Sequence, residues 1–340
     1  MFHIIGGRSR GFGLGAVDLV AAPRGIPGCA SKHCQFRETL RRSAIDQLTH
    51  SRSGGDTLFT SNGVEVAFNE QTSAPLQEFP RWREQSQLLR QAFRERGYLL
   101  LRGALDREAV LNLRADYFRR FDLALLADGT TPREGIFSGY VPASLPEYGT
   151  AGHPAYEFAR SQEFDAFTRD PQLHKIAETL LGGPMKLLPR RIVRHFQRST
   201  ARASRAHVDY DYLDRGSDQL VTAWIPLGDC PIACGGLVYL EGSHAIPRGQ
   251  LDLLRGHTDR PNDPRPLSND LSLTARVLGG RWLWADYQAG DVVFHSPHIV
   301  HASLDNTSEV MRLSADLRFL RADATRDERW SNDWSADDGY

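Results

Sequence analysis

Lysine is scarce in this chain of 340 residues: it occurs only at positions 32, 175 and 186, and arginine supplies nearly all of the positive charge. The 41 basic and 42 acidic side chains almost cancel, which leaves a formal net charge of -1. A chain without excess charge of one sign creates no overall field that would attract nucleic acid or an anionic membrane. We therefore expect neither as a partner.

Cysteine is also scarce, with four residues at positions 29, 34, 230 and 234. This number is too small for a fold held together by disulfides. The pair Cys230 and Cys234 has no further ligand at the spacing of a zinc finger, so we expect reduced thiols in a cytoplasmic protein. No run of about 18 apolar residues is present, and no transmembrane helix is predicted.

The two ends of the chain differ in composition from its middle. Residues 1–60 begin with a glycine-rich stretch that lacks the spacing of a nucleotide-binding loop, and we expect a flexible or poorly defined extension. From Phe79 the patterns of apolar residues become regular, and we expect one large domain over 75–322. Residues 323–340 are polar and acidic and are expected to form a tail.

Within the predicted domain, helical patterns come first and strand patterns follow. Apolar residues at helical spacing predict helices over 82–96, 106–126 and 163–181. Short segments of apolar and β-branched residues predict strands over 185–197, 219–227, 236–240, 291–295, 300–303 and 311–319. Helices followed by strands are typical of an α+β fold.

The motif His207-Val208-Asp209 indicates a metal site. Alternate side chains of an extended chain point to the same side, so His207 and Asp209 can face one point together. A third ligand must come from elsewhere, and His301 is the best candidate. Two histidines and one carboxylate occupy one face of an octahedral Fe(II) and leave positions open for O2 and a chelating co-substrate.

Three other residues compete for these roles. His295 and His298 are close to His301 in the sequence, but the spacing from His298 to Asn306 and Arg312 does not fit the expected site. Asp211 is two residues beyond Asp209 and is expected to be a loop residue.

Arg312 is the candidate for binding the co-substrate. It follows His301 by eleven residues, and a predicted turn at Asp305-Asn306 would return the chain beside the metal. Arginine binds carboxylates through two parallel hydrogen bonds, and 2-oxoglutarate presents a free carboxylate once its oxo acid end chelates a metal. Ser314 would face the same side and share that carboxylate, whereas Arg318 is a rival farther from the turn.

Four segments resemble the phytanoyl-CoA dioxygenase family of Fe(II)/2-oxoglutarate-dependent oxygenases, and the resemblance covers roughly residues 75–322. Besides the His207 motif they are Gly97-Tyr98-Leu-Leu-Leu-Arg102-Gly103, Gly235-Gly236-Leu-Val-Tyr-Leu-Glu-Gly242-Ser243-His244, and Gly290-Asp291-Val-Val-Phe-His295 with the segment from His301 to Ser314.

The resemblance implies a double-stranded β-helix, or jelly roll, flanked by helices, with 245–289 as an insertion over its mouth. It implies Fe(II) on His207, Asp209 and His301 as the catalytic centre, with 2-oxoglutarate on Arg312, Ser314 and Thr222. It also implies that O2 is consumed. Related halogenases lack the carboxylate ligand, so Asp209 favours hydroxylation or another oxidation of a small organic molecule in a bacterial biosynthetic pathway.

Substrate contacts are expected from Arg194, His195, Trp224 and His295. The basic strand that contains Arg194 favours an acidic substrate, because an arginine inside a barrel requires an anion. Two alternatives remain: a cupin-type metal oxygenase that does not use 2-oxoglutarate, and a barrel that binds a small acidic ligand without catalysis.

Overall fold

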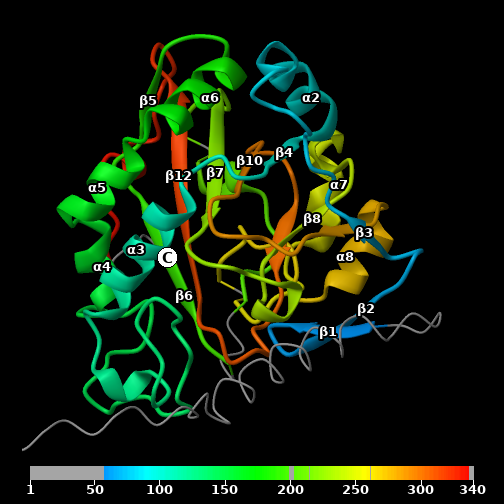
Figure 1. Ribbon diagram of the computed structural model, residues 1–340. Coiled ribbons are helices and arrows are strands. Elements are labelled where there is room, and N and C mark those ends of the chain that lie inside the picture. The colour runs from blue at the N-terminus through cyan, green and yellow to red at the C-terminus, as the bar shows by residue number, and fades with distance from the viewer. Residues whose placement is uncertain (1–56, 199–202, 214, 261, 337–340) are drawn as a thin grey trace, which may run out of the picture. The chain divides into compact units, whose positions relative to one another are not determined.

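The computed structural model describes residues 57–336, apart from 199–202, 214 and 261 (Figure 1). Most of the predicted N-terminal extension, with Cys29 and Cys34, lies outside the described residues. None of the helices in the described part of the chain is both long and apolar enough to cross a membrane.

The larger of the two main sheets has the strand order β4-β10-β7-β12-β5, and β6 also pairs with β12. All of its pairs are antiparallel. The strands are β4 (Tyr98–Leu101), β5 (Met185–Leu187), β6 (Ile192–Phe196), β7 (Leu220–Pro226), β10 (Val292–His295) and β12 (Arg312–Arg321). The predicted strand over 185–197 is therefore two strands, separated at Pro189, which has no amide hydrogen to donate to a sheet.

The smaller sheet has the order β11-β8-β9-β3, in which β3 and β9 are parallel. Its strands are β3 (Ser73–Pro75), β8 (Leu237–Leu240), β9 (Trp282–Trp284) and β11 (His301–Ser303), and a separate hairpin joins β1 (Thr57–Ser61) to β2 (Val64–Phe68). The two sheets meet through their inner side chains: the Tyr239 hydroxyl of β8 lies 3.3 Å from Nδ1 of His295 on β10.

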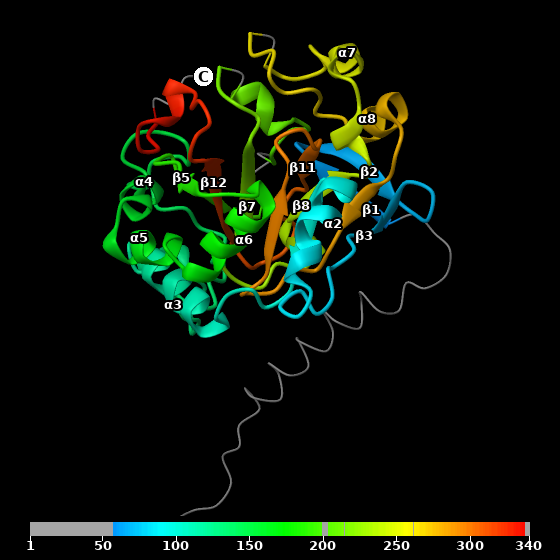
Figure 2. The ribbon, with the colours of Figure 1, turned by 90° about the horizontal axis from the view of Figure 1, so that it is seen from above.

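Helices cover the outside of the sheets, and α4 and α6 pack directly on strands of the larger one. In Figure 2 the helices α3 to α6 lie on one side of the sheets, and β1, β2 and α8 lie on the opposite side. The α-helices are α2 (Leu89–Arg96), α3 (Arg107–Phe118), α4 (Pro154–Ala159), α5 (Gln162–Thr168), α6 (Pro171–Leu181), α7 (Arg248–Leu251) and α8 (Leu271–Leu278). Short 3-10 helices lie at Ser86–Leu88, Leu123–Leu125, Asp209–Tyr212, Ile232–Cys234, Ser243–Ala245, Asp252–Leu254 and Glu328–Trp330.

The predicted helix over 163–181 is interrupted where a new helix begins. Asp170 accepts hydrogen bonds from the backbone N–H groups of Gln172 and Leu173, and Pro171 occupies the first position of α6. Proline favours this position because its missing N–H would have no partner in the first turn. These two residues end one helix and start the next.

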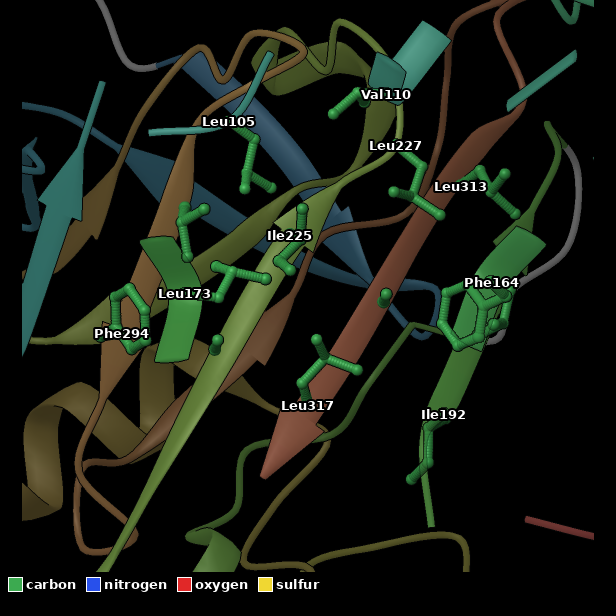
Figure 3. Close-up of a cluster of buried hydrophobic side chains, with 14 of the residues drawn as sticks. Leu105, Val110, Phe164, Leu173, Ile192, Ile225, Leu227, Phe294, Leu313 and Leu317 are labelled. Carbon is green, nitrogen blue, oxygen red and sulfur yellow. The ribbon is translucent and has the colours of Figure 1, made fainter. Parts of the chain in front are cut away.

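Strand β12 separates the helix-facing core from the barrel interior. Its apolar residues Leu313 and Leu317 belong to the core that β7 shares with α6, and Figure 3 shows Leu313 near Leu227 and Leu317 near Ile225. The alternate residues Arg312, Ser314, Asp316 and Arg318 are also buried, but they point to the other face. The interior of the barrel is therefore polar on this strand.

The folded region extends beyond the boundaries predicted from the sequence. The hairpin β1–β2 precedes residue 75, and strand β3, which ends at residue 75, pairs with β9. Strand β9, which belongs to the smaller sheet, lies within the segment 245–289 that was predicted to be an insertion. At the other end, Trp330 and Trp334 are buried in the core, so the chain packs beyond residue 322.

Candidate metal centre

Backbone pairing brings the predicted ligands together. His207 and His301 form an isolated antiparallel bridge in which each backbone N–H donates to the other's carbonyl at 3.0 Å. Asp209 begins a 3-10 helix directly after the His207 segment. One side-chain donor atom from each of the three residues lies within 4.8 Å of the others, and all three residues are buried. The arrangement matches the two-histidine, one-carboxylate set that holds mononuclear Fe(II).

Each imidazole is oriented by a backbone carbonyl. Nδ1 of His207 lies 2.7 Å from the carbonyl oxygen of Arg205, and Nδ1 of His301 lies 3.1 Å from that of Ile299. A carbonyl can only accept, so each Nδ1 carries the hydrogen and each Nε2 keeps its lone pair for a metal. The two Nε2 atoms are 3.7 and 3.8 Å from Oδ1 of Asp209, which leaves room between them for an ion.

Asp209 is held on both of its oxygens. The Thr222 hydroxyl donates to Oδ2 at 2.6 Å, and Nη2 of Arg318 lies 3.3 Å from Oδ1. Burial opposes ionisation of this carboxyl, but Arg318 and the neighbouring histidines outweigh it and hold its pKa well below the ordinary value. The pKa of His301 is lowered well below its usual range, mainly by burial and to a lesser extent by the neighbouring His207 and His295. A charged carboxylate and a neutral imidazole are the forms that bind a metal.

A small cavity that is partly open to solvent adjoins these ligands. It is lined by Arg194, Ser204, His207, Thr222, Leu237, His295, His301, Asp316 and Arg318. Arg194, Thr222 and His295 were predicted site residues, whereas Ser204, Leu237 and Asp316 were not singled out. The alternation of polar and apolar residues along 312–319 could have identified Asp316, which pairs with Arg194 at 2.6 Å.

Deeper polar groups in the barrel have unused hydrogen-bonding capacity. Nε and Nη2 of Arg312, Oγ of Ser314 and Nε1 of Trp224 are all buried without a hydrogen-bond partner among residues 57–336 as described. Arg312 and Ser314 are alternate residues of β12, and Trp224 opposes Asp316 on β7. These donors share one inward face, although they are not among the residues that line the cavity.

Nη1 of Arg312 donates a hydrogen bond to the carbonyl of Gly235, and the guanidinium lies over the ring of Phe196. Gly235 has a φ of +75°, and a Cβ there would lie 2.3 Å from the Leu304 carbonyl oxygen, so only glycine fits. Burial lowers the pKa of Arg312 to about 10, which still leaves it charged at neutral pH. Its Nε and Nη2 therefore fit a carboxylate such as the far end of 2-oxoglutarate.

The structure places some predicted residues away from the site. His195 points to the outer face of β6, where Nδ1 lies 3.0 Å from the Tyr117 hydroxyl and Nε2 lies 3.4 Å from the Met311 sulfur. Arg194 is the preceding residue of the same strand and points to the opposite face, because successive side chains of a strand face opposite sides. Asp211 is buried between Arg248 and Arg255 and has a structural role.

Cys230 and Cys234 are both buried free thiols beside the barrel interior. The Cys234 sulfur lies 3.1 Å from the hydroxyl oxygen of Ser308. The cluster of His207, Asp209 and His301 is the one group of three or more possible metal ligands found among the described residues.

Residues 93–314, about two thirds of the chain, match the profile of the family described as Phytanoyl-CoA dioxygenase (PhyH). The chain belongs to the phytanoyl-CoA dioxygenase family. It is therefore an enzyme, a non-haem oxygenase with iron as its metal and 2-oxoglutarate as its co-substrate. This confirms the expected enzyme class and cofactors and disfavours both alternatives, the cupin-type oxygenase and the non-catalytic barrel.

Two characterised relatives are similar over most of this phytanoyl-CoA dioxygenase-family chain. The 1-deoxypentalenic acid 11-beta-hydroxylase of Streptomyces arenae is 28% identical over 247 residues, which cover 68% of this chain and 80% of the relative. The enzyme of the same name from Streptomyces exfoliatus is 26% identical over 249 residues, with the same coverage.

The fold is similar to that of a solved structure, the non-heme alpha ketoglutarate dependent carbocyclase SnoK from nogalamycin biosynthesis. The TM-score is 0.50 and the sequence identity is 21%, with 74% of this chain and 89% of that chain covered. At this identity the likeness concerns the fold alone, and the predicted jelly-roll core flanked by helices is confirmed.

Proposed function

We propose that this enzyme hydroxylates a small organic molecule in a bacterial biosynthetic pathway, with iron held by His207, Asp209 and His301. The observation that carries the assignment is the buried cluster of these three side chains beside a cavity. Two relatives are named as hydroxylases of 1-deoxypentalenic acid, which supports hydroxylation as the reaction. Asp209 occupies the position where a halogenase would have a small residue, and this favours hydroxylation over halogenation.

The residues around the triad prepare it for the metal. The carbonyls of Arg205 and Ile299 keep both imidazoles in the tautomer that presents Nε2. Thr222 binds Oδ2 of Asp209, which fixes the carboxylate plane and leaves Oδ1 facing the two imidazoles. Groups that orient the ligands in this way raise metal affinity because the site needs no rearrangement when the ion binds.

Arg312 and Ser314 would hold the far carboxylate of 2-oxoglutarate, and Trp224 would add a third donor. Their free N–H and O–H groups are buried, and a buried donor without a partner costs about 1–3 kcal/mol. A carboxylate would remove this cost at several atoms at once. Thr222 was expected to bind the co-substrate as well; its hydroxyl donates to Asp209, and we infer that it acts through that ligand.

Iron and 2-oxoglutarate together supply the oxidation: O2 is consumed, 2-oxoglutarate becomes succinate and CO2, and one oxygen atom enters a C–H bond of the substrate. The chain supplies position and shelter. The buried walls formed by Leu237, His295 and Thr222 keep bulk water from the metal-facing side of the cavity. Exclusion of water strengthens the electrostatic contacts that orient both reactants.

Anaerobic titration with Fe(II) and 2-oxoglutarate tests this proposal directly. We expect a weak visible metal-to-ligand charge-transfer band in the wild type and none in His301→Ala. His298→Ala is the matched control, because His298 is three residues away and pairs with Asp218 outside the cavity. The control should keep the band.

Three results would contradict the proposal. A folded wild type without the band would exclude the 2-oxoglutarate chemistry. A band that persists in His301→Ala, or one that disappears in His298→Ala, would show that the wrong histidine has been assigned.

A further inference from the structure

Arg318 is a buried cation at the metal-facing cavity that lacks a full set of partners. Its side chain is 5% exposed, and it lines the cavity with Arg194 and the metal-ligand cluster. Nη2 lies 3.3 Å from Oδ1 of Asp209. Nε and Nη1 are buried and make no hydrogen bond within the part of the chain that the structure describes. Each free N–H of a charged guanidinium can form a charge-assisted hydrogen bond to a carboxylate, which is stronger than a hydrogen bond between neutral groups.

The guanidinium of Arg318 is held in place by stacking. Its central carbon lies 4.4 Å from the ring centroid of Trp330, which is itself buried. Nε1 of Trp330 donates to the Tyr212 carbonyl at 3.1 Å, and this contact joins the C-terminal segment to the 3-10 helix that begins at Asp209. An arginine fixed in this way loses little conformational freedom when it binds an anion.

Arg194, the other arginine of the cavity, differs from Arg318 because it already has a carboxylate. Its Nε lies 2.6 Å from Oδ2 of Asp316, and both residues belong to the same inward-facing patch of β6 and β12. That pair is neutral as a unit. Arg318 shares Asp209 with the metal, so Asp209 cannot neutralise it in the same way.

The balance of charge in the assembled site leaves one positive charge, if the proposed function is correct. The two positive charges of Fe(II) equal the two negative charges of 2-oxoglutarate, and the charges of Arg194 and Asp316 cancel. The single negative charge of Asp209 cancels only one of the two remaining cations, Arg312 and Arg318, so one positive charge is left. The imidazole ligands are neutral. An unbalanced charge in a closed site is costly, and it is relieved when a monoanion binds.

We infer that Arg318 binds the carboxylate of the substrate, and that this enzyme accepts small monocarboxylic acids in preference to their neutral analogues. This inference rests on the proposed function and adds the substrate class and the residue that selects it. Arg312 keeps the far carboxylate of 2-oxoglutarate, whereas Arg318 takes the carboxylate of the molecule to be oxidised.

The test compares acids with their primary amides, which have nearly the same shape and no charge. The probes are 1-deoxypentalenate, the acid in the name of the relatives, and adamantanecarboxylate. Binding to the anaerobic Fe(II)–2-oxoglutarate complex is measured by the change in the charge-transfer band and by calorimetry. At least one acid should bind the wild type about 10- to 100-fold more tightly than its amide, the range of a charge-assisted hydrogen bond.

Three variants separate the role of Arg318 from its surroundings. In protein saturated with Fe(II) and 2-oxoglutarate, Arg318→Gln should reduce the preference for acid over amide to less than about threefold. Arg318→Lys keeps the charge and should retain part of the preference. Arg190→Gln is the matched control, because Arg190 also stacks on Trp330 but does not line the cavity.

The outcomes are distinct. A wild type that binds neither acid, or binds acid and amide equally, overturns the assignment, as does a preference that survives in Arg318→Gln. Loss of 2-oxoglutarate affinity in Arg318→Gln, with normal affinity in Arg312→Gln, would make Arg318 the co-substrate anchor instead. If Arg318→Gln does not fold, a preference that is reduced but still present in folded Arg318→Lys supports the assignment, and an unchanged preference overturns it. Failure of the wild type to form the charge-transfer band at all would remove the proposed function itself.

Discussion

Two buried arginines in different regions of the molecule show how the same residue can serve structure or ligand binding. Arg114 of α3 lies in the helix-facing core, and Arg312 of β12 lies in the barrel interior. Each is 2% exposed, and burial lowers the pKa of each to about 10. Arg114 donates to the backbone carbonyls of Arg133, Glu134, Leu227 and Met311 at 2.8–3.1 Å. Arg312 donates to one carbonyl and leaves Nε and Nη2 without partners among the described residues.

Burial and pKa therefore do not distinguish the two arginines, whereas their hydrogen-bond partners do. The donors of Arg114 are used to join a helix to segments far along the chain. The donors of Arg312 are kept free at a cost to folding, and that cost is recovered when an anion binds. A buried charge with spare donors is thus a better sign of a ligand site than a buried charge alone.

Replacement of Arg312 tests the ligand side of this comparison. Arg312→Met should weaken 2-oxoglutarate binding by about 100-fold, because a charge-assisted pair of hydrogen bonds is lost. The free energy of unfolding of the ligand-free protein should be unchanged or slightly higher, since a poorly compensated buried charge is removed. Anaerobic titration and chemical denaturation measure the two effects. A large loss of stability with normal 2-oxoglutarate affinity would place Arg312 with Arg114 as a structural residue.

Replacement of Arg114 should have the opposite pattern. Arg114→Met leaves several buried carbonyls without a donor and should lower the free energy of unfolding by at least about 3 kcal/mol. Protein that remains folded at low temperature should bind 2-oxoglutarate within a factor of about three of wild type, because Arg114 lies outside the barrel. Urea denaturation of the variant beside Arg312→Met gives the comparison. Equal stability of the two variants would remove the distinction drawn between these arginines.

Removal of a single neutral donor should have the smallest effect. Trp224→Phe keeps most of the ring that packs on Tyr287 at 4.7 Å but loses the unpartnered Nε1–H. We expect the KM for 2-oxoglutarate to rise by about 5- to 10-fold, the value of one neutral hydrogen bond, while kcat stays within about twofold. Steady-state kinetics of 2-oxoglutarate consumption measure both. An unchanged KM would exclude Trp224 from the co-substrate site.

Local spacing predicted that His207 and Asp209 can face one point together, and that Arg312 and Ser314 share one face of a strand. In the structure Val208 is extended and Asp209 begins a 3-10 helix, whereas Arg312 and Ser314 lie on a regular strand. The same rule distinguishes Arg194 from His195, which face opposite sides of β6. The sequence could not show which of the two side chains points into the barrel, because strand alternation places them on opposite faces but does not tell which face is the inner one.

What each buried polar group touches was decided by the tertiary structure alone. The partners of Asp209 come from β7, β12 and the segment of His301, and Trp330, which stacks on Arg318, comes from beyond the predicted domain boundary. The sequence by itself determined residue types, their order and their period along each strand, since these depend on backbone geometry over a few residues. Only the packed sheets decided which donors found carbonyls and which remained free, because such contacts join residues more than a hundred positions apart.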